Sequence, residues 1–182
     1  LPVRPDLEEL FPRRGLKRGS VVGLTTGAPG ATSLAFATLA AASQQGSWTA
    51  LVGLPAIGVV AAHEAGIDLT RCALVPDPGP TWPTVVAALL DAIDLVVLAP
   101  PRNVVRAADA RRLSARARER GAVLLVLGPW PEGPDVRLRP SAATWTGIGA
   151  GHGALAARTL DVVTGGRGAA ARERRVQVRL PS

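Results

Sequence analysis

The stretch that most constrains the fold is residues 21–34, which read VVGLTTGAPGATSL. An apolar run leads into a turn of glycine, proline and threonine, and the turn opens an alanine-rich segment. A strand that feeds a glycine-rich turn at a helix N-terminus is the layout of a phosphate-binding loop, because backbone N–H groups of such a turn converge on an anion. This stretch therefore predicts a strand–turn–helix unit around which the rest of the chain folds.

The stretch keeps only part of the phosphate-loop pattern G-x-x-x-x-G-K-[ST]. Gly30 matches the second glycine, and Thr32 matches the hydroxyl that would hold Mg²⁺. Thr25 replaces the first glycine and Ala31 replaces the lysine, so the main phosphate-binding charge is missing. The remaining helix dipole contributes about 1 kcal/mol to anion binding, which is too little to select ATP. We interpret the turn as a vestigial nucleotide loop without a cofactor, formed by Thr26, Gly27, Gly30, Ala31 and Thr32.

Strands alternate with helices as far as residue 127. Apolar strands are predicted at about residues 20–24, 48–54, 72–75, 94–99 and 122–127, and helices at about 31–43, 57–65, 81–92 and 104–120. This alternation implies βαβ units and a mostly parallel sheet. Shorter strands, predicted at 136–138, 143–148, 158–163 and 174–180, indicate an antiparallel extension at the edge of the parallel core.

The domain organisation follows from these elements. We expect an N-terminal segment over residues 1–19, in which Asp6 caps a helical turn with Glu9 three residues on. A single domain is expected over 20–182, with a parallel core at about 20–128 and antiparallel strands at about 135–180. Because the chain has no methionine and begins at Leu1, we expect it to be part of a longer product.

The chain is strongly basic, with a formal charge of +7, and Lys17 is its only lysine. This balance favours an acidic partner such as nucleic acid, although an arginine-rich composition also arises from a GC-rich genome. The single cysteine, Cys72, excludes an internal disulfide and fits a reducing cytosol. His63 and His152 share no metal-ligand spacing with Cys72, so no metal site is expected.

Arginines gather in two regions that are candidates for contacts with DNA or a protein partner. Arg112, Arg116 and Arg120 share one face of the predicted helix, which is either an electrostatic footprint or a solvated surface. Trp130, after the last core strand, either stacks on a base, anchors a partner or covers the sheet edge. Residues 176–180 alternate as in an edge strand, which a partner strand can join. The remaining candidates are Arg102, Arg167, Arg174, Arg175 and Arg179.

Several long stretches together resemble a known family. They are LPVRPDLEELFPRRGLKRGSVVGLTTG, then GSWTALVGLP with EAGIDLTRCALVPDPGPTWPTVVAALLDAIDLVVLAPP, then ARRLSARARERGAVLLVLG with W-x-G-I-G-A-G-H-G and the GGRG turn. In order and spacing they resemble the RecA-like ImuA family, in particular the actinobacterial ImuA-prime branch, often labelled SulA-like. The resemblance implies a RecA-like three-layer α/β core with a mostly parallel sheet and an antiparallel C-terminal extension.

The chain departs from the RecA pattern where catalysis requires specific groups. Ala31 occupies the position of the phosphate-binding lysine. The strand that should end in an aspartate ends in Ala99 and Pro100, and Asp94 lies at its opposite end. The region after the second strand, where a glutamate is usual, reads GLPA at residues 53–56. Three parts of the phosphoryl-transfer machinery are absent together, so we do not expect hydrolysis.

The resemblance implies a non-catalytic accessory protein in DNA-damage-induced translesion synthesis, part of the SOS response and of mutagenic DNA repair. It implies direct binding to an ImuB-type Y-family polymerase homologue and, through it, to a DnaE-type error-prone polymerase and the sliding clamp. DNA binding and self-association are further expectations, as is a cytoplasmic location near the nucleoid during DNA damage. Two alternatives stay open: a nucleotide-dependent DNA-binding RecA-like ATPase, and a SulA-like cell-division inhibitor.

Overall fold

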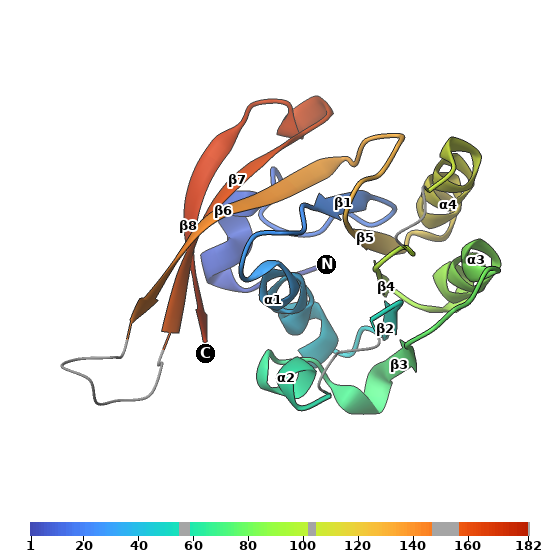
Figure 1. The fold of residues 1–182 in the computed structure, drawn as a ribbon, viewed down its shortest axis with the longest axis horizontal. Helices are drawn as coiled ribbons and strands as arrows, with labels where there is room; N and C mark the ends of the chain where they lie inside the picture. The colour runs from blue at the N-terminus through green and yellow to red at the C-terminus, as the bar shows by residue number, and fades with distance from the viewer. Residues whose placement is uncertain (55–58, 102–104, 147–156, 182) are drawn as a thin grey trace.

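In the computed structural model, which describes residues 1–54, 59–101, 105–146 and 157–181, an eight-stranded sheet runs through the molecule (Figure 1). The strand order is β3-β2-β4-β5-β1-β6-β7-β8. The strands are β1 (Val21–Leu24), β2 (Thr49–Val52), β3 (Cys72–Val75), β4 (Leu95–Leu98), β5 (Val123–Leu127), β6 (Val136–Thr146), β7 (Ala157–Gly166) and β8 (Arg174–Pro181).

The sheet has a parallel part and an antiparallel part, which confirms the predicted α/β class. Strands β1 to β5 pair in parallel, and β6 also joins β1 in parallel. Strands β7 and β8 then add antiparallel neighbours. The two short strands predicted at 136–138 and 143–148 are one strand, β6, with an irregularity between Pro140 and Ala142. Proline lacks a backbone donor, which explains the local break in register.

Helices cover the parallel part on both faces, giving three layers (Figure 1). The helices are α1 (Ala31–Gln44), α2 (Val59–Glu64), α3 (Trp82–Ala92) and α4 (Ala107–Arg120). Residues of α1 and α2 belong to one apolar cluster, and residues of α3 and α4 belong to the other. Strands β1, β2, β4 and β5 are buried along their whole length, as expected for strands covered on both sides.

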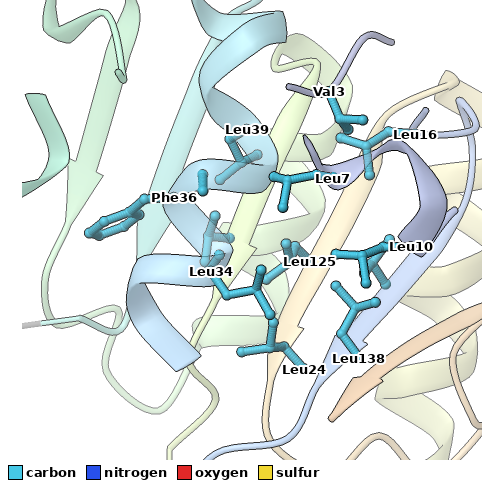
Figure 2. Packing of buried hydrophobic residues seen from close by; sticks show 14 of the residues in the cluster. Val3, Leu7, Leu10, Leu16, Leu24, Leu34, Phe36, Leu39, Leu125 and Leu138 are labelled. Atoms are coloured by element: carbon cyan, nitrogen blue, oxygen red, sulfur yellow. The ribbon is translucent and has the colours of Figure 1, made fainter. Parts of the chain in front are cut away.

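The N-terminal segment contributes to the main core. Figure 2 shows Leu7 and Leu10 in the same cluster as Leu39 of α1 and Leu138 of β6. The predicted cap at Asp6 is wrong: the segment forms a 3₁₀ helix, η1 (Pro5–Leu10), whose N-cap is Arg4, two residues earlier. Proline is favoured at the first position of a helix because the N–H that it lacks would have no partner there in any case. Asp6 instead accepts a hydrogen bond from Nε of Arg4 at 3.0 Å.

Only one face of the antiparallel part is covered. Leu138, Leu160 and Val178 are completely buried on the face that packs against η1 and α1. Helices α3 and α4 lie over the parallel strands and stop short of β6–β8 (Figure 1). The described residues contain no helix long and apolar enough to cross a membrane.

Candidate functional site

The turn after β1 joins the strand to α1 through two glycines in the left-handed region. Gly27 and Gly30 have φ angles of 101° and 92°, in the left-handed region that favours glycine. Helix α1 begins directly after Gly30, and the side chains of Thr26 and Thr32 are exposed. The predicted strand–turn–helix unit is therefore present.

The start of α1 packs against β7 and the core. Ala31 is 7% exposed and belongs to the main apolar cluster. Arg158 of β7 donates from Nη2 to Oγ of Ser33 at 2.6 Å. A Cβ placed on Gly30 would lie 2.9 Å from Cδ2 of Leu160 and 3.1 Å from Cζ of Arg158. Close packing on β7 therefore requires glycine at position 30, whether or not the turn holds a ligand.

Asp94, the acidic residue next to β4, makes its contacts within the fold and away from the loop. Asp94 precedes β4 and accepts hydrogen bonds from Nη1 of Arg18 at 2.9 Å and from the backbone N–H of Trp48 at 3.1 Å. At the other end of β4, a Cβ on Gly53 would lie 2.1 Å from the carbonyl oxygen of Ala99. The ends of β2 and β4 thus approach too closely for a side chain at position 53. Residues 55 and 56 lie outside the described part of the chain.

A separate cavity of about 850 Å³ opens beyond the carboxyl ends of β2, β3 and β4. Prolines form much of its wall, and its charged residues are Asp77, Arg106 and Asp109. None of the loop residues around Gly30 lines it. This cavity is therefore separate from the nucleotide loop, and Asp77 and Asp109 do not complete that loop.

The arginine face predicted on α4 is occupied by a contact with α3. Arg116 donates from Nε and Nη2 to the Asp91 carboxylate at 2.5 and 2.7 Å, and Arg120 donates to the same carboxylate at 3.1 Å. The hydrogen bonds from Arg116 hold the pKa of Asp91 below its ordinary value. Arg112 pairs more loosely with Asp109, at 3.4 Å. Helical spacing placed these arginines on one face correctly, but two of them, Arg116 and Arg120, form ion pairs with Asp91 of α3.

Trp130 is a structural residue in this fold. Its side chain is 6% exposed, and Nε1 donates to Oγ of Ser114 on α4 at 3.1 Å. The interpretation of Trp130 as a stacking platform or partner anchor is therefore wrong, because the indole is already packed beneath α4. Arg102 lies outside the described residues.

The C-terminal arginines divide among different surfaces. Arg167 lies at the turn after β7 and pairs with Asp135 at 3.4 Å. Arg175 and Arg179 lie opposite Val163 and Thr159 of β7, on the uncovered face of the sheet. Arg174 neighbours Arg175 along β8 and therefore belongs to the opposite face of the sheet, and it is exposed at the end of the strand. The structure thus brings together two of the four predicted residues.

Two arginines that the sequence interpretation missed complete this surface. Arg139 of β6 lies opposite Val163, so it shares a row across three strands with Arg175. Arg137 lies two residues before it and points to the same side, because side chains alternate along a strand. The alternation in VRLR, residues 136–139, carried this signal. We call Arg137, Arg139, Arg175 and Arg179 the outer arginine face.

The outer arginine face has few acidic neighbours. Arg139 pairs with Glu173, and Asp161 accepts a hydrogen bond from Nε2 of Gln177 at 2.9 Å. Within the part of the chain that the structure describes, the guanidinium groups of Arg137, Arg175 and Arg179 form no ion pair. All three residues are exposed. Uncompensated charges of one sign on an open sheet attract an acidic partner.

Comparison with known proteins identifies the family. The model of the MT3502 N-terminal domain family matches residues 9–132, which is more than half of the chain. The chain belongs to this family. Among its relatives, the uncharacterized protein Rv3395c of Mycobacterium tuberculosis is 46% identical over 110 residues, which cover 60% of this chain and 53% of that protein. The chain therefore spans about half the length of this relative.

The region that the family model matches contains strands β1 to β5 and not the antiparallel strands. Residues 9–132 run from η1 to the loop after β5 and include the parallel strands β1 to β5. They end before β6, so the outer arginine face lies beyond the match to the MT3502 N-terminal domain. The relative is mycobacterial, in keeping with the actinobacterial origin implied by the sequence resemblance.

Proposed function

We propose that this domain is a non-catalytic, RecA-like accessory protein in DNA-damage-induced translesion synthesis. It binds an ImuB-type Y-family polymerase homologue directly, and through that protein it joins a DnaE-type error-prone polymerase and the sliding clamp. The proposal rests on the sequence resemblance to the ImuA family together with the features of the loop and of the C-terminal sheet described above.

The loop supports a role without catalysis. The lysine position is a buried alanine, and β7 packs directly on Gly30, the residue that precedes α1. The strand ends of β2 and β4 carry Gly53 and Ala99, neither of which can activate water or hold Mg²⁺. Phosphoryl transfer depends on such groups for charge neutralisation and for positioning.

The outer arginine face is the observation that carries the binding proposal. Among the described residues, three of its four guanidinium groups form no ion pair, and they lie on the face of β6–β8 that no helix covers. Arginine donates in a planar fork that suits carboxylates, so such a face fits an acidic surface of a protein partner.

Charge reversal on this face tests the proposal. Deleting residues 167–182 would remove Val178 and Leu180, which are buried in the core, so point substitutions are preferable. The test variant is Arg175→Glu with Arg179→Glu. The matched control is Arg106→Glu with Arg118→Glu, two exposed arginines next to or on α4 that form no ion pair within the described ranges.

A pull-down with the polymerase homologue should lose most of the captured protein with the test variant and none with the control. Equal capture by both variants would contradict the proposal. Anisotropy with a labelled single-stranded oligonucleotide forms the second arm. If the test variant loses only the oligonucleotide and still captures the homologue, the outer arginine face binds DNA instead of this partner.

A further inference from the structure

The two edge strands of the sheet, β3 and β8, differ in how they are protected. They lie at opposite ends of the sheet (Figure 1). Strand β8 carries Arg174, Arg175 and Arg179, and η1 packs against it. Arg4, next to η1, donates from Nη2 to the carbonyl oxygen of Arg179 at 2.9 Å. Charged side chains and a covering element are common ways to keep an edge strand from pairing with another chain.

The edge formed by β3 has neither protection. Its four residues, Cys72–Val75, are uncharged, and none is a proline. Each is at least partly exposed, whereas β1, β2, β4 and β5 are buried along their whole length. Leu74 is 45% exposed and is one of three exposed large apolar residues in the part of the chain that the structure describes. Among the described strands, β3 pairs with β2 alone, so its other edge is open.

The backbone of β3 directs hydrogen-bonding groups toward this open edge. The N–H of Gly53 donates to the carbonyl oxygen of Val75 at 2.9 Å, so the backbone of Val75 faces the β2 side. In a paired strand, successive residues direct their N–H and C=O groups to alternate sides. The N–H and C=O groups of Leu74 and Cys72 therefore point away from β2. A row of such groups is a template for a further strand.

Opposite charges stand at the two ends of β3. Arg71 directly precedes the strand, and Asp77 follows its last residue by two positions. Both residues are exposed, and neither forms an ion pair within the described ranges. If two copies of β3 pair antiparallel, the start of each strand lies beside the end of the other. Arg71 of each copy then meets Asp77 of the other copy, whereas parallel pairing would bring like charges together.

We propose that β3 is a self-association edge, at which two copies of this domain pair antiparallel about a two-fold axis. Backbone hydrogen bonds of Leu74 and Cys72 join the two copies, and each Leu74 side chain is covered by the β3 strand of the other copy. Main-chain hydrogen bonds supply the affinity in such strand additions. The contact closes at two copies because each contributes the same edge. Its ladder is short, so the dimer is weak and reversible.

The features of this edge fit a second copy better than an unrelated partner. A two-fold contact requires a surface that is complementary to itself, and an uncharged centre flanked by one cation and one anion meets this requirement. The uncharged centre offers no cation to a phosphate backbone, so nucleic acid does not fit it. Strand β3 lies at the opposite end of the sheet from β8, which carries part of the outer arginine face. This inference therefore does not depend on the polymerase homologue.

Sedimentation equilibrium of the whole domain, from micromolar to millimolar concentrations, tests the proposal. The mass of the parent should rise from one copy toward two. Leu74→Lys places like charges near each other at the centre of the contact and should weaken the dimer about tenfold or more. The matched control, Gln177→Lys, adds the same charge at an exposed position of the other edge strand and should dimerise as the parent does. Circular dichroism and urea unfolding check that both variants remain folded.

Exchange of the end charges tests the antiparallel arrangement. Arg71→Asp and Asp77→Arg, each alone, bring like charges together twice in the dimer and should weaken it about fivefold. The double variant should restore the parent dissociation constant. An ionic strength of about 0.15 M screens charges more than about 8 Å apart, so the comparison reports the local pairs.

Three outcomes would overturn the proposal. The first is a parent that stays monomeric over the whole concentration range. The second is a Leu74→Lys variant that dimerises as well as the Gln177→Lys control. The third is a charge exchange that fails to restore the dimerisation lost in the single variants at Arg71 and Asp77.

Discussion

Gly30 stands where β7 meets the start of α1. Its left-handed φ of 92° alone favours glycine, and Leu160 and Arg158 leave no room for a Cβ. Gly27 has a similar φ of 101°, but a Cβ at that position would meet no atom within 4 Å. Substitutions at the two glycines can therefore distinguish the cost of backbone strain from the cost of close packing.

The substitution Gly30→Ala should lower the free energy of unfolding more than Gly27→Ala does. A left-handed alanine costs about 1–2 kcal/mol, and this applies to both variants. Forcing a methyl group into packed surroundings adds about 1–3 kcal/mol, and this applies only at position 30. Urea unfolding of both variants measures the difference. Equal losses in the free energy of unfolding would show that packing against β7 does not restrict position 30.

At the scale of elements, α3 and α4 are joined by Asp91. Its carboxylate takes hydrogen bonds from Arg116 and Arg120 on the neighbouring helix. Trp130 joins α4 to the loop after β5 in a similar way, through Ser114. Arginines and a tryptophan that look free in the sequence thus serve as links between elements.

The Asp91 contact should make stability depend on pH in the acid range. Hydrogen bonding by Arg116 lowers the pKa of Asp91 in the folded state below the ordinary value of 3.8. The stabilisation is therefore present above about pH 4 and is lost as the pH falls through the folded-state pKa. Asp91→Asn should lower the unfolding midpoint near neutral pH, and its difference from the parent should shrink on acidification.

Urea or thermal unfolding between about pH 7 and pH 2.5 measures this difference. The variant Arg116→Gln with Arg120→Gln removes the same contact from the other side, so it should show the same profile. A difference between Asp91→Asn and the parent that stays constant with pH would contradict this account.

At the scale of the whole molecule, local sequence patterns predicted where the elements lie along the chain better than which elements pair in the sheet. Continuous apolar strands and the glycine-bounded helix at 31–43 were recoverable because spacing and turn residues act within one element. The class of fold, with a parallel core and an antiparallel extension, followed from the alternation of these elements. The pairing of β6 with β1 in parallel was not contained in any local pattern.

The candidate site was less predictable because it depends on distant contacts. Arg116 meets an acid that lies 25 positions earlier, and Trp130 packs on a serine 16 positions earlier. Arg137 and Arg139 join Arg175 only through the register of β6, β7 and β8. Sequence spacing locates charges on an element, whereas the sheet determines which of those charges remain open to a partner.

The central claim is that this domain binds a polymerase homologue through its surface and without nucleotide. The most direct test is calorimetry of the whole domain with the ImuB-type homologue, in the presence and absence of ATP and Mg²⁺. We predict the same dissociation constant in both conditions and no heat from ATP at micromolar concentrations. Micromolar binding of ATP, or an affinity for the homologue that requires it, would contradict the account.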